Sequence, residues 1–386
     1  MAQANEVKFK ARLLAKCGEN TIYFDGICHS CRQKQRRDEI LNLSADEVEA
    51  MILKIADRVD EIEKWDEICN DFWALFSLLS IHDPRIARAA AAKEIYYPLE
   101  LYFGAPDDVK DALITKLNSL EDNSKNVLNH LLCALAWQGG EQTAELFYEL
   151  YKNPRPWRKK LYVGTEFYAK IGGWAFDETG ERKSLVFDKC LTAVRIKDGK
   201  RASQSANLNS NQNTDEPVQI GEPTGQKCEF CGCEILDMLR LKATEPRLAF
   251  LNLKHDAIFR CCPTCVGSVR YFCKRGPDGE IELSYEGEGF DESYFSQQDM
   301  TRLCGMKFKL GGEVSPFYGC FSELDTTVGG YPQWVQDAEY LTCPSCGGTM
   351  KHLAQIPFGE MIQGEGVIYV QICEKCEILG GCFQCT

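Results

Sequence analysis

The sequence predicts a multidomain α+β protein, with an all-α N-terminal half of helical hairpins and a mostly β, zinc-stabilised C-terminal half. Two observations predict this division. Between residues 44 and 151, apolar side chains recur every three or four positions, which is the period of an amphipathic helix. From residue 227 to the end, short apolar runs alternate with Gly, Pro and Asp turns, and paired Cys-x-x-Cys motifs lie among them.

The length and the charge of the chain limit the classes of protein to consider. At 386 residues the chain is too long for one ordinary hydrophobic core, so two or three domains are expected. The formal net charge of −13 disfavours general binding to nucleic acid or to an anionic membrane, and it favours a basic partner. The sequence has no run of about 20 apolar residues that could cross a bilayer.

The chain contains 21 cysteines, and their meaning depends on the redox compartment. The first 20 residues are polar and contain lysines, without the apolar core of a secretion signal. We therefore expect a cytoplasmic protein, in which clustered cysteines are more often metal ligands than disulfides.

Helix signals follow a cysteine-bearing lead over residues 1–40, and they predict a helical domain over 44–196. Ser44 and Glu47 have the spacing of a capping box, in which each side chain accepts a hydrogen bond from the other residue's backbone N–H. Asp83 followed by Pro84 predicts another helix start, with Asp83 as the N-cap. Short turns between helices of similar length predict a HEAT-like stack of helical hairpins. Further helices are expected over 106–120, 124–138 and 141–151.

The composition changes after the last of these helices. Residues 161–196 are rich in Tyr, Phe, Val and Gly, and a turn at 177–180 predicts a β-hairpin that closes the helical domain. Residues 197–226 contain almost no large apolar side chain, so we expect a flexible linker there. Residues 227–386 are then expected to form a β-rich module with two zinc-ribbon sites.

Two sets of four cysteines have the spacing of zinc-ribbon sites. Zn²⁺ favours a tetrahedron of four thiolates, and one Cys-x-x-Cys turn supplies two of them from a tight loop. A closed set of this kind leaves no position for water or substrate, so both sites are predicted to be structural. The predicted ligand sets are Cys228, Cys231, Cys262 and Cys265, and Cys343, Cys346, Cys373 and Cys376.

Other cysteines leave alternatives open. Cys233 and Cys261 lie next to predicted ligands and could exchange with them. We interpret the C-terminal pair Cys382 and Cys385 as packed thiols in preference to a further half-site. A third metal site near the N-terminus could be formed by Cys17, Cys28, His29 and Cys31. His29 would be an awkward ligand in it, because it lies inside the Cys-x-x-Cys loop.

Signals for catalysis or nucleotide binding are scarce. The chain has no H-E-x-x-H zinc-protease motif, no G-x-x-x-x-G-K-[ST] phosphate loop and no G-x-S-x-G nucleophile elbow. We therefore predict a protein that is not an enzyme. The basic stretch 155–160 is the best candidate for nucleic-acid contact, but we favour a solvated turn with Trp157 packed into the helical domain.

A longer pattern in the C-terminal part resembles a known family. The pattern consists of VGGYPQWVQ at 328–336, CPSCGGTM at 343–350, LAQI at 353–356 and GVIYVQIC at 366–373. Over residues 309–386, it is similar to the C-terminal module of the YwqG-like domain family, in the cysteine-containing bacterial version. Residues 130–195 resemble the helical segment that accompanies such modules.

The resemblance implies a class of function and no particular reaction. Many members of the family occur among the immunity proteins of polymorphic-toxin and secretion systems, which bind and neutralise a cognate toxin. We therefore expect a bacterial immunity protein that occludes a basic toxic effector such as a nuclease, with the acidic surface steering the partner. The alternative is a zinc-ribbon protein associated with nucleic acid, and a third hypothesis is a scaffold that binds several partners through its helical half.

Overall fold

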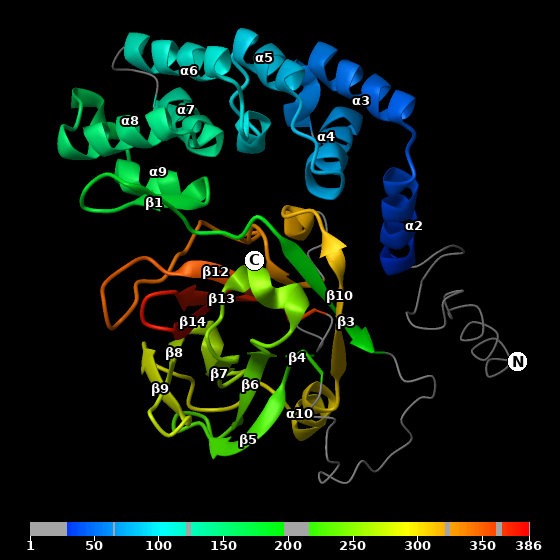
Figure 1. The fold of residues 1–386 in the computed structure, drawn as a ribbon, viewed down its shortest axis with the longest axis vertical. Helices are drawn as coiled ribbons and strands as arrows, with labels where there is room; N and C mark the ends of the chain where they lie inside the picture. Colours follow the sequence, from blue (N-terminus) through cyan, green and yellow to red (C-terminus); the bar gives the residue numbers. More distant parts are fainter. Residues whose placement is uncertain are drawn as a thin grey trace, which may run out of the picture.

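The computed structural model describes residues 29–64, 66–120, 125–196, 216–320, 325–359 and 365–385. The N-terminal half is helical and the C-terminal half consists mainly of antiparallel sheets, which confirms the predicted α+β class. Figure 1 shows the helices as a layer along one side of the β half. The helices of this layer are α2 (His29–Leu41), α3 (Ala45–Asp57), α4 (Glu67–Trp73), α5 (Pro84–Ala92), α6 (Asp107–Ser119), α7 (Lys125–Gln138), α8 (Glu141–Lys152) and α9 (Thr165–Ile171).

Capping bonds start two helices where the sequence predicts them. The Ser44 N–H donates to the Glu47 carboxylate at 2.7 Å, and the Glu47 N–H donates to Ser44 Oγ at 3.3 Å, so the predicted capping box is formed. At the start of α5, Asp83 Oδ1 accepts from the Arg85 N–H at 2.8 Å. These bonds satisfy backbone N–H groups that lack a partner within the helix. Within the described residues, no helix is both long and apolar enough to span a lipid bilayer.

The helices contact helices that are next, or next but one, in the sequence. α3 contacts α5, α5 contacts α6, and α6 contacts α7, while α7 and α8 both contact α9. Their buried faces, with Ile55, Leu113 and Leu132 at 1% exposure or less, form the core of the helical half. The strands β1 (Trp174–Phe176) and β2 (Arg182–Ser184) pair across the predicted turn, which confirms the hairpin.

The β half is built on an eight-stranded antiparallel sheet with the strand order β10-β3-β11-β12-β13-β14-β8-β9. A smaller sheet has the order β4-β6-β5, with β7 also paired to β6, and it shares one hydrophobic core with the large sheet. A short helix, α10 (Gln297–Cys304), packs at the edge of this core. The strands are β3 (Cys190–Ile196), β4 (Val218–Gln219), β5 (Glu222–Lys227), β6 (Glu234–Leu241), β7 (Ala257–Cys261), β8 (Arg270–Arg275), β9 (Ile281–Glu286), β10 (Lys307–Val314), β11 (Thr326–Gly329), β12 (Lys351–Pro357), β13 (Val367–Cys373) and β14 (Ile378–Gln384).

The predicted end of the helical domain at residue 196 is wrong. β3 lies inside the large sheet, between β10 and β11, with Ala193 opposite Leu310 on one side and Thr326 on the other. Leu191 and Ala193 are buried in the core of the β half. The strand follows the hairpin in sequence, but its long-range partners place it in the other half.

The predicted linker over residues 197–226 also extends too far. β4 and β5 already occupy Val218–Gln219 and Glu222–Lys227, where they pair with β6. β5 is largely exposed, so the backbone hydrogen bonds of strand pairing order it without a row of apolar side chains. Residues 197–215 of the predicted linker lie outside the described residues.

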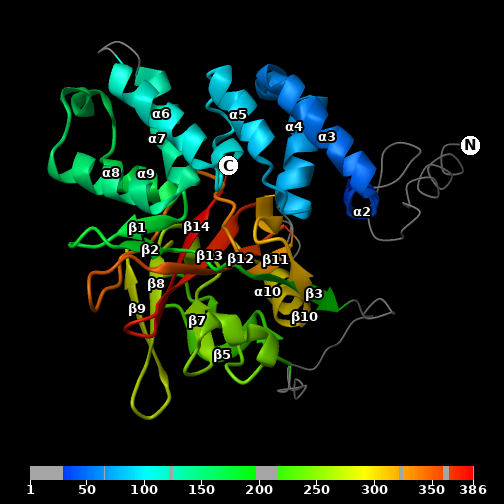
Figure 2. The same cartoon turned by 45° about the horizontal axis from the view of Figure 1, so that its top comes forward.

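Aromatic side chains join the two halves, which meet where the helices lie across the large sheet (Figure 2). The ring of Phe317, from the β half, lies 4.3 Å from that of Phe76 and 4.8 Å from that of Phe103, measured between centroids. Tyr331 stacks on Trp137 with the ring centroids 5.7 Å apart. Phe317 is 2% exposed and belongs to the core of the helical half, so the halves share a hydrophobic contact.

Candidate metal centres

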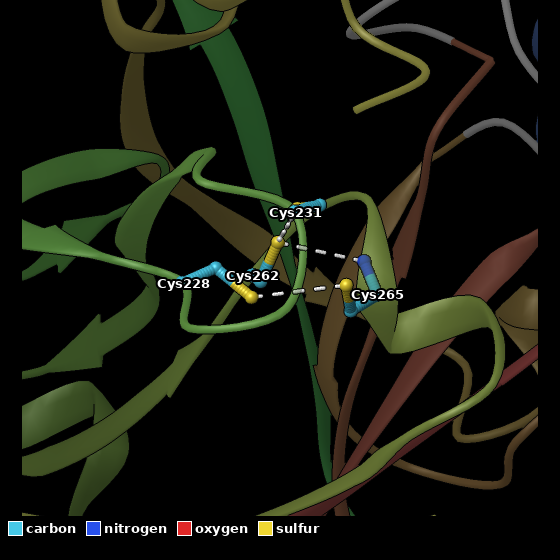
Figure 3. Close-up of side chains that lie close together, drawn as sticks. All are labelled: Cys228, Cys231, Cys262 and Cys265. Atoms are coloured by element: carbon cyan, nitrogen blue, oxygen red, sulfur yellow. Dashed lines mark hydrogen bonds between the residues drawn. The ribbon is translucent and has the colours of Figure 1, made fainter. Parts of the chain in front are cut away.

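The first cysteine cluster lies at one end of the smaller sheet (Figure 3). Cys228 and Cys231 lie in the loop between β5 and β6, and Cys262 and Cys265 directly follow β7. β6 and β7 are antiparallel neighbours, so the start of β6 and the end of β7 lie at the same end of the sheet. Strand pairing therefore brings the two Cys-x-x-Cys turns together, as the spacing predicts.

The sulfur positions in the first cluster fit one metal ion. All four Sγ atoms lie within 4.8 Å of one another. Cys228 Sγ is 3.7 Å from Cys265 Sγ, and Cys231 Sγ is 3.5 Å from Cys262 Sγ. Zn–S bonds of about 2.3 Å place the corners of a tetrahedron about 3.8 Å apart, whereas a disulfide holds its sulfurs at about 2.05 Å. The group therefore has the dimensions of a four-thiolate metal site.

The second cluster has the same plan on the large sheet. Cys343 and Cys346 lie in the loop before β12, while Cys373 ends β13 and Cys376 lies in the turn to β14. β12 and β13 are antiparallel, and all four Sγ atoms again lie within 4.8 Å of one another. The distance between Cys346 Sγ and Cys373 Sγ is 3.6 Å. Both predicted sets of four are thus assembled.

The first turn of each cluster has the same backbone geometry. The Cys228 N–H donates to the Cys233 carbonyl at 2.8 Å, and the Gly232 N–H donates back to the Cys228 carbonyl at 2.9 Å. In the second cluster, the Cys343 N–H donates to the carbonyl five residues later at 2.8 Å, and the Gly347 N–H returns a bond of 2.9 Å. Gly232 and Gly347 have φ angles of +69° and +71°, a left-handed conformation that favours glycine.

The thiols of the second cluster differ in acidity. The backbone N–H of Gly348 beside Cys346 lowers the pKa of that thiol to about 7, and the neighbouring cysteines add to the effect. Burial raises the pKa of Cys373 to about 12. Metal binding requires thiolates, so an ion entering this site displaces protons from the more buried cysteine.

Several other cysteines do not belong to the four-sulfur groups. Cys233 is not a member of the first group, although its side chain hydrogen-bonds to Cys262 and contacts Met300 Sδ at 3.6 Å. Cys261, which is fully buried, is not a member either. Cys382 is 3% exposed and its Sγ contacts the Glu339 carbonyl, which is the expected packed thiol, while Cys385 is exposed. Of the suggested third site, Cys17 and Cys28 lie outside the described residues, and His29 and Cys31 belong to the first turn of α2.

Sequence reasoning missed three buried glutamines that hold the second cluster in place. Gln355 on β12, Gln371 on β13 and Gln384 on β14 are each 3% exposed or less. Strand register puts all three side chains on one face of the large sheet, because Gln355 is opposite Tyr369 and Gln384 is opposite Val367. We call these residues the glutamine row. The available signal was a glutamine within each of three strands that are mainly apolar.

The glutamine row binds the backbone of the segment 333–341, which leads directly into Cys343. Gln355 Oε1 accepts from the Gln333 N–H at 3.0 Å, and Gln384 Oε1 accepts from the Gln336 N–H at 3.0 Å. Gln371 Oε1 accepts from the Leu341 N–H at 2.8 Å. Residues on three strands thereby fix a loop that has no regular secondary structure of its own.

Comparisons with known proteins give one relative of undescribed activity. The protein described as "Uncharacterized protein YpfL" of Salmonella typhimurium is 26% identical over 301 residues. The alignment covers 76% of this chain and 66% of that protein, so the chain spans just under two thirds of the relative's length. A share of 76% is more than the β half alone contains, so the similarity includes both halves. No protein-family model and no solved structure matches the chain.

Proposed function

We propose that this chain is a non-enzymatic, protein-binding protein whose β half is held in shape by two structural zinc ions. The observation that carries the proposal is the composition of the two clusters, each of which consists of four cysteine sulfurs at tetrahedral distances. Four thiolates favour zinc or an iron–sulfur cluster, and the ribbon-type turns favour zinc. With all four positions taken by protein, such an ion supports structure and does not activate a substrate.

We further propose that the bound partner is a toxic effector and that the chain is its immunity protein. The resemblance of residues 309–386 to the YwqG-like family supports this finer assignment. The net charge of −13 supports a basic partner, such as a nuclease, because long-range attraction speeds association between oppositely charged surfaces. Inhibition would be steric, with the zinc-stiffened β half presenting a shape that needs little reorganisation on binding.

The test is affinity capture of the full chain from lysate of its own cells, followed by mass spectrometry and a growth assay. We expect one stoichiometric, basic partner, and co-expression of this chain should rescue growth of cells that produce that partner. The C343S/C346S double variant should lose the rescue, while C385S, which replaces an exposed cysteine outside both clusters, should keep it. A set of many unrelated partners, or a captured partner whose expression is harmless, would contradict the immunity role.

Exposed aromatic rings with lysine side chains lying over them favour a second candidate function, which is binding to single-stranded nucleic acid. Tyr162 is 85% exposed, and Lys125 Nζ lies 3.4 Å from its ring centroid. Lys170 Nζ lies 5.2 Å from the ring of the exposed Phe167. Exposed rings and cations are the groups on which bases stack and phosphates bind. Trp157, in contrast, is 8% exposed and packs into the helical core, as the solvated-turn interpretation predicts.

The two candidates differ in a simple chromatographic test. A nucleic-acid-binding protein should be retained on heparin at low salt, and Tyr162→Ala should reduce its retention. An immunity protein with a net charge of −13 should pass through unretained.

A further inference from the structure

A cavity of about 580 Å³ lies at the junction of the helical half and the β half. Its lining comes from the end of α7, from the β1–β2 hairpin and the segment after it, and from the β half at Tyr331 and Lys351. The volume is in the range of sites that hold small molecules, and boundaries between structural units are common places for such sites. None of its lining residues is one of the clustered cysteines.

Two residues that line the cavity each have a buried hydrogen-bond donor without an acceptor. Trp137 is 7% exposed, and its indole N–H has no partner among the described residues. The buried Nε of Arg182 likewise has no partner there. A buried polar group without a partner costs free energy, so two such donors in one wall require an explanation. Neither indole nor guanidinium can accept a hydrogen bond, so the missing partner must be an acceptor.

The charges around the cavity favour a negatively charged acceptor. Three cations, Arg182, Lys189 and Lys351, line it together with one acid, Asp188, in a chain that is acidic overall. Lys351 Nζ pairs with a Glu374 oxygen at 3.2 Å, and Lys189 lies 3.9 Å from a Glu313 oxygen. Arg182 forms no ion pair with a described residue and instead lies over the Trp174 ring, 5.5 Å from its centroid. Its charge therefore remains available to a ligand.

The remaining walls are flat and apolar. Tyr331 stacks on Trp137 with an interplanar angle of 21°, and Phe103 contacts Tyr331 edge to face with centroids 5.8 Å apart. Phe187 and Phe250 line the side that faces the β half. Aromatic walls gain most from a planar apolar group, which buries its faces against them.

From these four observations we propose that the cavity binds a small oxyanion joined to a flat apolar group, such as an aryl carboxylate or an aryl phosphate. The anion accepts from the Trp137 indole N–H and from the Arg182 guanidinium, and the flat group lies among the aromatic side chains. Because the lining comes from both halves, a bound ligand also holds the helical layer against the sheet. This proposal does not depend on the immunity function.

The test is calorimetric titration of the zinc-loaded full chain with phenyl phosphate, benzoate and neutral phenol at pH 7.5. We expect one of the two anions to bind with 1:1 stoichiometry and at least about tenfold more tightly than phenol. Phenyl phosphate and benzoate separate a phosphate ligand from a carboxylate ligand. If neither anion binds at millimolar concentration, or if phenol binds as well as both anions, the proposal is wrong.

Matched variants show whether binding occurs at this cavity. Arg182→Gln should lower the affinity for the anion by at least about tenfold. Lys183→Gln removes the same charge from the next residue, which points away and pairs with Asp177 at 2.9 Å, and it should change affinity less than about twofold. Trp137→Phe keeps a ring but removes the N–H, and it should also weaken binding. An equal loss of affinity in the Lys183 and Arg182 variants would show that the anion is attracted by charge in general, and it would overturn the assignment of the site to this cavity.

Discussion

The side-chain amide of Gln371 accepts a hydrogen bond from the Leu341 N–H at 2.8 Å, thirty residues away in the sequence. The same amide donates to the Glu339 carbonyl at 2.8 Å, so one buried side chain takes up two backbone groups of the loop before Cys343. Gln371 is fully buried, so water cannot replace either bond. The second cysteine cluster is therefore positioned by side-chain hydrogen bonds as well as by strand pairing.

Replacing Gln371 with Leu should destabilise the β half by about 1–3 kcal/mol, because it leaves the buried Leu341 N–H without a partner and leaves the Glu339 carbonyl with only the weaker Cys382 thiol donor. The loop should then release Cys343 more readily, and zinc should transfer faster to a chelator. Urea unfolding and the rate of zinc release measure the two effects. Gln226→Leu, at an exposed position of β5, is the matched control and should change neither quantity. An unchanged release rate in the Gln371 variant would show that the glutamine row does not support the centre.

The double variant C343S/C346S should bind about one zinc ion fewer per chain and should unfold its β half at a lower temperature. Serine hydroxyls are poor ligands for zinc, so the remaining two cysteines cannot complete the tetrahedron. Metal analysis by mass spectrometry gives the stoichiometry, and calorimetry gives the melting temperature. C385S should behave like the parent chain. A double variant with full zinc content would show that these two cysteines are not ligands.

Stability should fall as the pH is lowered from about 6.5, because burial lowers the pKa of His352 to about 3 and that of His82 to about 4. In the unfolded chain each imidazole takes up a proton near pH 6.5, whereas the native state keeps it neutral down to these lower values. The stability that depends on neutral His352 and His82 is thus fully present above pH 6.5, and it is lost as the pH falls below that value. Each histidine contributes at most about 1.4 kcal/mol per pH unit in this window.

Unfolding measured in urea between pH 7 and pH 4.5 tests this dependence. His352→Leu should flatten the slope, while His255→Gln, whose side chain is 63% exposed, should leave it unchanged. The zinc content must be followed in parallel, because thiolate protonation also acts at low pH. An identical slope in parent and His352→Leu protein at constant zinc content would contradict the assignment to this histidine.

Truncation of Phe317 should uncouple the two halves. This ring contacts Phe76, Phe103 and Trp137 of the helical half, so Phe317→Ala should cost about 3–5 kcal/mol and leave a cavity between the halves. We expect the single thermal transition to separate into two. Far-ultraviolet circular dichroism monitors unfolding of the helices, and zinc release monitors unfolding of the sheets. Phe167→Ala, at an exposed ring, should keep one transition. One unsplit transition in both variants would show that other contacts couple the halves.

The predictions from sequence succeeded where the signal was local. Ser44 and Glu47 lie within one helical turn, so their capping box needs no distant partner. The four Cys-x-x-Cys turns are also local, and only the pairing of one turn with another depends on the fold. The prediction for β3 failed because its strand partners lie more than 100 residues further along the chain. The glutamine row was missed because a glutamine in a strand is usually exposed. Only the tertiary structure buries these side chains against the loop whose backbone they bind.

The sequence by itself determined the helical and β-rich halves, the capped helix starts at Ser44 and Asp83 and the eight clustered cysteines, since periodicity, caps and paired turns are short-range properties. Only the tertiary structure decided to which half β3 belongs and which side chains bind the loop before Cys343. It also decided that Trp137, Arg182 and Tyr331 line one cavity. These features join residues that are remote in the sequence. Their positions follow from how strands pair and how two cores pack, and no local pattern of residues records that outcome.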